Sequence, residues 1–282
     1  MLSRTRRRQL VMGLETVLGL RKRGFFLPYR YADSVEVPKS YPALEPLFEQ
    51  AAPVFTALLN EIDALTPAIE ALIGADRGCR LDQAWFPRLD ALAAYAMIQT
   101  RKPERIVEIG SGHSSRFMAA AIEDGGLATR LTCIDPAPRA SLKGLNVTWR
   151  KAILQTAGDA DWQALEAGDI LFVDSSHLLM PGTDVDHLIG HVLPMLPKGI
   201  LLHVHDIFLP DAYPETWAWR GYNEQAAIAA LLHGGGYRML FASRYAATRM
   251  TERLAETPLL GQARITADQD DLAGSLWLEK LI

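Results

Sequence analysis

The chain has 282 residues, of which 49% are hydrophobic and 22% are charged, and its formal net charge is −4. This composition is that of a globular protein with a sizeable core, and it excludes a chain that is disordered throughout. The acidic balance gives no general attraction to nucleic acid, and no apolar run reaches the roughly 18 residues of a transmembrane segment. Two distant cysteines, Cys79 and Cys133, exclude a disulfide framework and favour a reducing compartment, so we expect a cytoplasmic protein.

The N-terminus combines basic residues with a short apolar run. Four arginines between Arg4 and Arg8 precede the run Leu10–Leu20, and the basic segment Arg21–Arg23 follows it. Apolar residues within the run recur at helical spacing, which predicts an amphipathic helix with basic flanks. Two roles remain open for this helix: docking on the rest of the protein, or binding a membrane surface or an anionic partner.

The next part of the chain is predicted to be helical only in places. Residues 24–46 are rich in proline and aromatic residues, which prevents a regular helix. Residues 53–73 have a helical pattern with a break before Pro67, and Pro87 suits the first turn of a further helix. We therefore assign residues 1–85 to an N-terminal helical and aromatic extension and residues 86–282 to the main domain.

After Pro103, short apolar runs alternate with helical segments. This alternation is typical of an α/β protein with a mostly parallel sheet and helices on both faces. Helices are expected near 114–123, 183–195 and 223–232, with Asn223 as the cap of the last one. The predicted strands are Arg105–Ile109, Arg130–Ile134, Val147–Ala152, Asp169–Val173, Ile200–Val204, Tyr237–Ala242 and Ser275–Glu279.

The first predicted strand runs into a glycine turn at Gly110–Gly112, and a helix follows. Glycine lets the backbone turn tightly and approach a ligand, and ligands of such sheets lie at the carboxyl ends of the strands. A dinucleotide-binding turn would have a third glycine at position 115, where this chain has Ser115. Glu108 precedes the turn, and Asp135 ends the second strand, where a carboxylate can accept hydrogen bonds from both ribose hydroxyls. These features favour S-adenosylmethionine over NAD.

Titratable residues follow the fourth and fifth predicted strands. Asp174 and His177 end one strand, and His205 and Asp206 end the other, so we expect all four near the glycine turn. A histidine suits a general base, and two carboxylates suit Mg²⁺, whereas His205 would favour a transition metal. His203 lies inside an apolar run, and we interpret it as a core histidine.

The loop at residues 207–222 is rich in aromatic residues and carries Arg220. It leaves the same end of the sheet, so it is either an acceptor pocket or lid, or a loop that buries its own rings.

Four segments together resemble class I methyltransferases, which use S-adenosylmethionine: Glu108–Ser115, Cys133–Pro136, Phe172–His177 and His205–Asp206. Within that class the chain is similar to the bacterial group related to macrocin- and mycinamicin-type sugar O-methyltransferases and cephalosporin-biosynthesis proteins. The resemblance covers roughly residues 103–282 and implies a Rossmann-like, seven-stranded sheet whose last strand is antiparallel. The resemblance and the position of the strand ends together assign these residues to cofactor binding: Glu108, Ile109, Gly110, Ser111, Gly112, His113, Ser114, Asp135, Pro136 and Asp174.

The resemblance also implies a base and a cation site. The spacing of Asp174 and His177 resembles the metal ligand and base of metal-dependent sugar O-methyltransferases, and Asp206 matches a second metal carboxylate. His205 stands where an acidic residue is usual. We therefore assign His177 as the catalytic residue, and Asp174, His205 and Asp206 as candidate ligands of Mg²⁺ or another divalent cation. A metal-independent version, with His177 alone, remains open.

The leading hypothesis is a methyltransferase that uses S-adenosylmethionine to methylate a hydroxyl of a small-molecule acceptor, a sugar or glycoconjugate. One alternative is an NAD-dependent oxidoreductase, against which Ser115 and Glu108 argue. Another is a non-catalytic, cofactor-binding interaction module whose N-terminal helix docks a partner. The sequence leaves open whether the protein is a homo-oligomer.

Overall fold

Seven strands in the described part of the chain form one sheet. The computed structural model describes residues 3–75, 77–261 and 272–282. Strands β1 to β5 run parallel, and β7 runs antiparallel to both of its neighbours. This is the α/β, Rossmann-like, mostly parallel sheet that the sequence predicts, including its antiparallel last strand. Across the sheet the order is β3 (Thr148–Arg150), β2 (Arg130–Ile134), β1 (Arg105–Ile109), β4 (Ile170–Val173), β5 (Leu201–Val204), β7 (Leu276–Lys280) and β6 (Tyr237–Ala242).

The register of the central strands aligns their carboxyl ends. Ile109, the last residue of β1, pairs with Ile134 of β2 and with Val173 of β4. Val173 in turn pairs with Val204 of β5. The residues that follow these strands therefore begin at one level of the sheet, and this level is where the candidate site lies.

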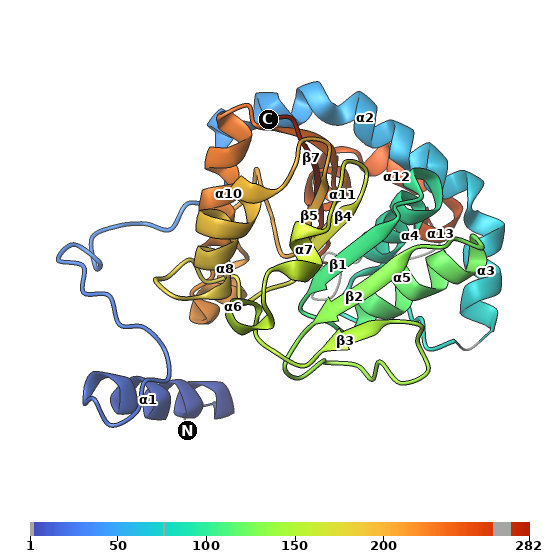
Figure 1. Cartoon of the computed structure of the whole chain (residues 1–282). Coiled ribbons are helices and arrows are strands. Elements are labelled where there is room, and N and C mark those ends of the chain that lie inside the picture. The colour runs from blue at the N-terminus through green and yellow to red at the C-terminus, as the bar shows by residue number, and fades with distance from the viewer. Residues whose placement is uncertain (1–2, 76, 262–271) are drawn as a thin grey trace. The chain divides into compact units, whose positions relative to one another are not determined.

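Helices cover both faces of the sheet, which explains why β4 and β5 are buried along their whole length. Figure 1 shows α4 (Arg88–Arg101) and α5 (His113–Asp124) on one side, and α8 (Asp184–His187) and α10 (Glu224–His233) on the other. The remaining elements of the main body are η1 (Pro42–Leu44), α2 (Glu45–Ala64), α3 (Thr66–Gly74), α6 (Leu154–Ala157), α7 (Ala160–Gln163), η2 (Leu188–Val192), α9 (Leu193–Met195), η3 (Glu215–Arg220), α11 (Ser243–Arg249), α12 (Thr251–Glu256) and α13 (Pro258–Gly261).

Several predicted boundaries differ from the structure. The helix expected from residue 53 begins at Glu45, because Pro46 lies in its first turn, where a missing N–H costs nothing. The break before Pro67 is confirmed. Asn223 does not cap α10 with its side chain, which instead binds both backbone groups of Leu179. The predicted strand at 147–152 is limited to β3.

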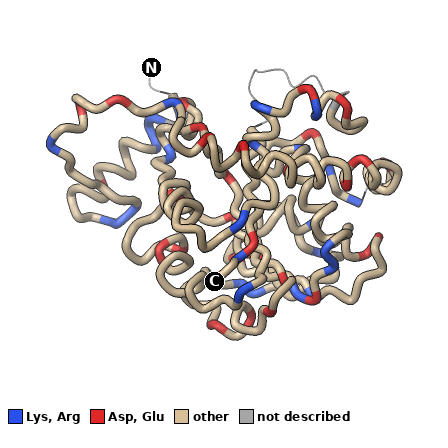
Figure 2. The backbone as a smooth tube through the Cα atoms, turned by 90° about the horizontal axis from the view of Figure 1, so that it is seen from above, with Lys and Arg blue, Asp and Glu red and all other residues tan. Residues whose placement is uncertain are grey.

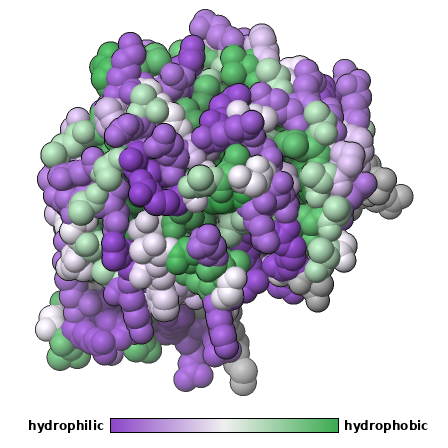
Figure 3. Space-filling model, turned by 45° about the vertical axis from the view of Figure 1, so that its right-hand side comes forward, coloured by the Kyte–Doolittle hydropathy of each residue, from purple (hydrophilic) through white to green (hydrophobic). Residues whose placement is uncertain are grey.

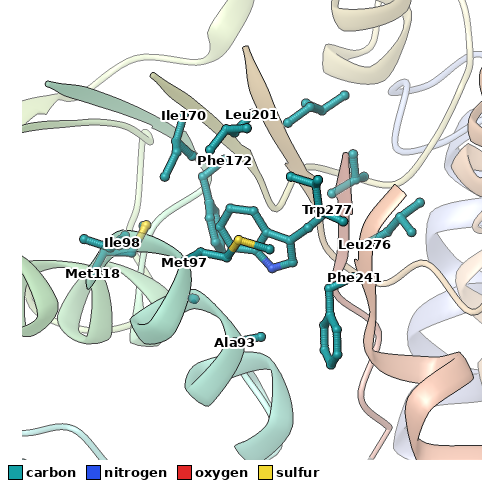
Figure 4. Packing of buried hydrophobic residues seen from close by; sticks show 14 of the residues in the cluster. Ala93, Met97, Ile98, Met118, Ile170, Phe172, Leu201, Phe241, Leu276 and Trp277 are labelled. Atoms are coloured by element: carbon teal, nitrogen blue, oxygen red, sulfur yellow. The ribbon is translucent and has the colours of Figure 1, made fainter. Parts of the chain in front are cut away.

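The core lies between the sheet and its helices. Figure 4 shows Met97 of α4, Phe172 of β4 and Trp277 of β7 meeting there. His203 stacks on Phe172 with ring centroids 3.6 Å apart, and its Nε2 pairs with Ser275 Oγ at 2.8 Å. Burial lowers the pKa of His203 well below its usual value. The prediction of a core histidine is confirmed.

The described chain divides into two units, Met1–Pro38 and Lys39–Ile282. The second unit contains α2 and α3 as well as the sheet. In the first unit, α1 (Arg4–Val17) confirms the predicted N-terminal helix, and its apolar Leu10 and Leu14 are about half exposed. None of the described helices combines the length and apolar character needed to cross a bilayer.

The surface is mixed in character. Basic and acidic residues are interspersed along the chain (Figure 2), in keeping with its small formal net charge of −4. The face shown in Figure 3 likewise mixes hydrophilic and hydrophobic residues.

Candidate functional site

The glycine turn lies directly against the end of β4. Gly110 has a φ of +80°, and its N–H donates to the carbonyl of Ile134 at 3.0 Å. A Cβ at this position would lie 1.8 Å from the backbone oxygen of Asp174, so a side chain has no room. Between β1 and β4, the N–H of Asp174 donates to the carbonyl of Ile109 at 2.8 Å. The turn and the start of the Asp174–His177 segment are therefore in backbone contact.

Glu108, which precedes the turn, holds it by hydrogen bonds to the serines that follow it. Its buried carboxylate accepts hydrogen bonds from the hydroxyls of Ser114 and Ser115, both at 2.6 Å. The N–H of Gly112 donates to Ser115 Oγ at 2.9 Å, so the start of α5 is tied to the end of β1. Burial raises the pKa of Glu108 to about 7, and the serine hydrogen bonds oppose that rise.

Polar groups at and beside the turn have hydrogen-bonding capacity left for a ligand. The carboxylate of Asp135 accepts from the N–H of Ser111 at 2.7 Å and of Ala137 at 2.6 Å, and each oxygen keeps a further lone pair. Ser111 Oγ and His113 Nδ1 are buried and have no hydrogen-bond partner among the described residues. Pro136, beside Asp135, is exposed. Unsatisfied polar atoms beside a spare carboxylate fit a polar, nucleoside-containing cofactor.

His177 occupies the centre of a cluster of carboxylates. Its Nε2 lies 3.3 Å from Asp174 Oδ1 and 3.3 Å from Asp206 Oδ2, and its Nδ1 lies 2.9 Å from Glu224 Oε2. Its ring is also 4.6 Å from that of Tyr222. The backbone of His177 has a φ of 59°, a left-handed conformation that non-glycine residues adopt at a cost and that concentrates at functional sites.

His205 and Asp206 complete the cluster from β5. His205 Nδ1 lies 3.4 Å from Asp206 Oδ1 and 3.7 Å from Asp174 Oδ1. Its Nε2 lies 3.3 Å from Asp90 Oδ2. Asp206 also has a left-handed φ, of 55°. All four residues that the sequence placed near the turn are thus brought together.

The opposed charges of the cluster shift its pKa values. Burial lowers the pKa of His177, but Asp174 and Glu224 outweigh it and hold that pKa well above its usual value. For His205, Asp206 and Asp174 likewise outweigh burial. Burial would raise the pKa of Asp174, yet the two histidines keep it below its usual range. Burial raises the pKa of Glu224, and its hydrogen bond to His177 opposes that rise.

This arrangement has the geometry of a cation site. One ligand atom from each of Asp174, His177 and Asp206 lies within 4.8 Å of the others. The sequence proposed His205 as the nitrogen ligand. In the structure His177 is the histidine that joins this triad, while His205 lies beside both carboxylates and pairs with Asp90.

Sequence reasoning missed Asp90 and Glu224. Both acids are buried, with 0% and 2% of their surface exposed. Asp90 contacts His205, and Glu224 contacts His177. Asp90 precedes an apolar run in α4, and Glu224 is in the first turn of α10. An acid in an otherwise apolar helix was the available signal for Asp90.

The aromatic loop packs its own rings and also reaches the site. Phe208 contacts Trp217 at 5.2 Å between ring centroids, and Trp217 contacts Tyr222 at 5.8 Å. The guanidinium of Arg220 lies 3.9 Å from the centre of the Trp217 ring. Because Tyr222 also contacts His177, the loop forms one wall beside the candidate base.

Comparisons with known proteins found one family model and several similar solved structures. Residues 107–207 match a family model described as a methyltransferase domain. No curated protein sequence matches the chain. Solved structures that are similar include the SAH-bound Podospora anserina methyltransferase PaMTH1, with 17% identity over 92% of this chain and 100% of that one and a TM-score of 0.41. The plantazolicin methyltransferase BpumL, in complex with SAH and a desmethyl analogue, has 13% identity over 84% of this chain and 100% of that one and a TM-score of 0.44. The cmcI-D160 Mg-SAM structure has 13% identity over 67% of this chain and 69% of that one and a TM-score of 0.35.

The region matched by the domain model, residues 107–207, runs from β1 through the end of β5. It therefore includes the glycine turn, Asp135 and the site residues Asp174, His177, His205 and Asp206, whereas Asp90 and Glu224 lie outside it. This match identifies a methyltransferase domain within the chain, and the sheet order is that of a Rossmann-like fold.

Proposed function

We propose that the protein methylates a hydroxyl oxygen of a small molecule, a sugar or glycoconjugate, with His177 as the general base. The observation that carries this proposal is the position of His177. It is buried, it is held by carboxylates on both ring nitrogens, and its segment is in backbone contact with the glycine turn.

The contacts of His177 define which nitrogen is basic. Glu224 accepts the Nδ1–H, as the carboxylate of a catalytic triad does, and so orients the ring. Asp174 and Asp206 face Nε2 and hold the pKa of His177 above its usual value, so Nε2 has a free lone pair only after it loses its proton. A cation held by these two carboxylates would offset their charge and favour the neutral imidazole. A hydroxyl that attacks a methyl group must lose its proton, and in this proposal Nε2 accepts it.

The glycine turn and Asp135 would hold the methyl donor. Asp135 has acceptor capacity for ribose hydroxyls, and Ser111 Oγ and His113 Nδ1 offer further hydrogen bonds. When bound, S-adenosylmethionine supplies an electrophilic methyl group on a sulfonium. The role of the chain is to align the acceptor oxygen with that group and to exclude competing nucleophiles.

Asp174 and Asp206 would hold a divalent cation, with His205 as the nitrogen neighbour, because His177 Nε2 cannot bind the ion and also accept a proton. Carboxylate oxygens favour Mg²⁺, and the histidines extend the choice to transition metals. When bound, such a cation supplies Lewis acidity that makes an acceptor hydroxyl easier to deprotonate. In the metal-independent version, the same carboxylates orient His177 and raise its pKa, so the base would act at a pH above that pKa.

Replacement of His177 by alanine tests the proposed base. We expect turnover to fall by roughly 10²–10⁴-fold with unchanged affinity for S-adenosylhomocysteine, because a base acts on the reaction and not on cofactor binding. His233→Ala, at an exposed position of α10, is the control and should keep full turnover. Unchanged turnover in His177→Ala would remove the base assignment while leaving the cofactor site intact.

A further inference from the structure

A second cluster of metal-ligating side chains lies outside the candidate active site. Asp159 precedes α7, His187 ends α8, and His191 lies in the following turn, η2. One ligand atom of each lies within 4.8 Å of the others. All three residues are only partly buried.

The backbone brings the two histidines to one side of the helix. Residues four apart on a helix are neighbours on its surface, and the rings of His187 and His191 have centroids 4.8 Å apart. Residues Leu188–Val192 form a π-helical turn, a feature that often accompanies functional sites. The buried Trp162 packs edge-on against the His191 ring at 5.4 Å and limits its movement.

The third ligand already stands at a suitable distance. Asp159 Oδ2 lies 3.3 Å from His191 Nε2. Metal bonds of about 2.0–2.1 Å at tetrahedral angles would place two ligand atoms about 3.3–3.4 Å apart. Gln163 Nε2 approaches the same Oδ2 at 3.5 Å, a contact long enough to be exchanged for a metal bond.

We propose that Asp159, His187 and His191 form a surface site for a divalent transition-metal ion of the zinc, nickel or copper type. Two imidazoles and one carboxylate suit these ions, whereas the carboxylate-rich group of Asp174 and Asp206 suits a harder ion. The fourth position faces solvent and would be filled by water. A bound ion would join α7 to the helix that follows the His177 loop, and it would therefore stabilise the folded protein.

Titration of the full chain with Ni²⁺ alone tests the site. The variant His187→Gln/His191→Gln should raise the Kd for the surface site by more than about tenfold, since even loss of an outer partner of a metal site costs about that much. Asp174→Asn/Asp206→Asn removes the candidate active-site ligands and should retain the surface site. His233→Gln is the matched control for a histidine elsewhere on the surface.

Thermal unfolding gives a second readout that does not depend on activity. Zn²⁺ should raise the Tm of Asp174→Asn/Asp206→Asn, and this rise should be lost when His187→Gln/His191→Gln is added to that variant. Circular dichroism would confirm that each variant is folded. The proposal is overturned if Asp174→Asn/Asp206→Asn binds neither Ni²⁺ nor Zn²⁺, or if it binds Ni²⁺ as tightly after His187→Gln/His191→Gln is added.

Discussion

At Gly110, an added methyl group would collide with the backbone of Asp174. Its φ is +80°, and a Cβ would lie 1.8 Å from the Asp174 carbonyl oxygen, whereas at Gly126, with a φ of +57°, a Cβ meets nothing within 4 Å. Gly126→Ala should therefore cost only the backbone strain, about 1–2 kcal/mol. Gly110→Ala must also displace the β4 end, so we expect a larger loss, above about 3 kcal/mol, and loss of cofactor binding. Urea unfolding of the two variants measures the difference, and equal stabilities would contradict the close approach at Gly110.

Glu108 predicts a pH dependence of stability. Its pKa rises from 4.5 to about 7 on folding, so between these values the folded state binds more protons than the unfolded state. Stability should therefore fall as pH rises through this window, by up to about 1.4 kcal/mol per pH unit from this group. In Glu108→Gln, an isosteric neutral variant whose amide can still pair with both serines, this contribution should vanish. Denaturant unfolding at pH 5 and pH 7 compares the two proteins, and parallel profiles would argue against a buried, protonated Glu108.

At the residue scale, the sequence predicted the groups that follow strands and missed the groups that support them. Gly110, Asp135 and Asp174 were predictable because a strand end fixes their position along the sheet. Glu224 and Asp90 act on His177 and His205 across 47 and 115 residues of sequence. No local pattern encodes such contacts, because they depend on how helices pack on the sheet.

At the element scale, Asp90 connects α4 to two strands. Its carboxylate accepts from the N–H groups of Gly274 and Ser275, just before β7, both at 3.0 Å, and faces His205, just after β5. Asp90→Asn replaces one acceptor oxygen by an NH₂ group and leaves buried donors unpaired, so we expect a loss of about 2–4 kcal/mol. The exposed Asp82→Asn should change stability by less than about 0.5 kcal/mol. Thermal or urea unfolding measures both, and an unaffected Asp90→Asn would show that this link is dispensable.

The helix expected at 183–195 illustrates a limit of pattern reading. The structure divides it into α8, the π-helical turn η2 and α9. Pro194 lacks the N–H that would bond to the carbonyl of Gly190, so a continuous α-helix loses a hydrogen bond there. Apolar spacing predicted the existence of the helix correctly, but it does not report the pitch of a single turn.

At the scale of the whole molecule, the fold was predictable because short buried strands alternate with helices over most of the chain. The place of α2 and α3 was not, because their sequence shows helices without showing what they pack against. The structure includes both in the unit Lys39–Ile282, with the sheet. The role of the basic N-terminal helix stays a prediction, with docking and anionic-surface binding both open.

Calorimetric titration of the full chain with S-adenosylhomocysteine, with and without Mg²⁺, tests the central claim most directly. The account predicts saturable binding at one site per chain, weakened in Asp135→Ala because the ribose loses its carboxylate partner. An effect of Mg²⁺ on that binding would support cation binding by Asp174 and Asp206. No binding in either condition would contradict the cofactor site, and with it the reason for assigning catalysis to His177.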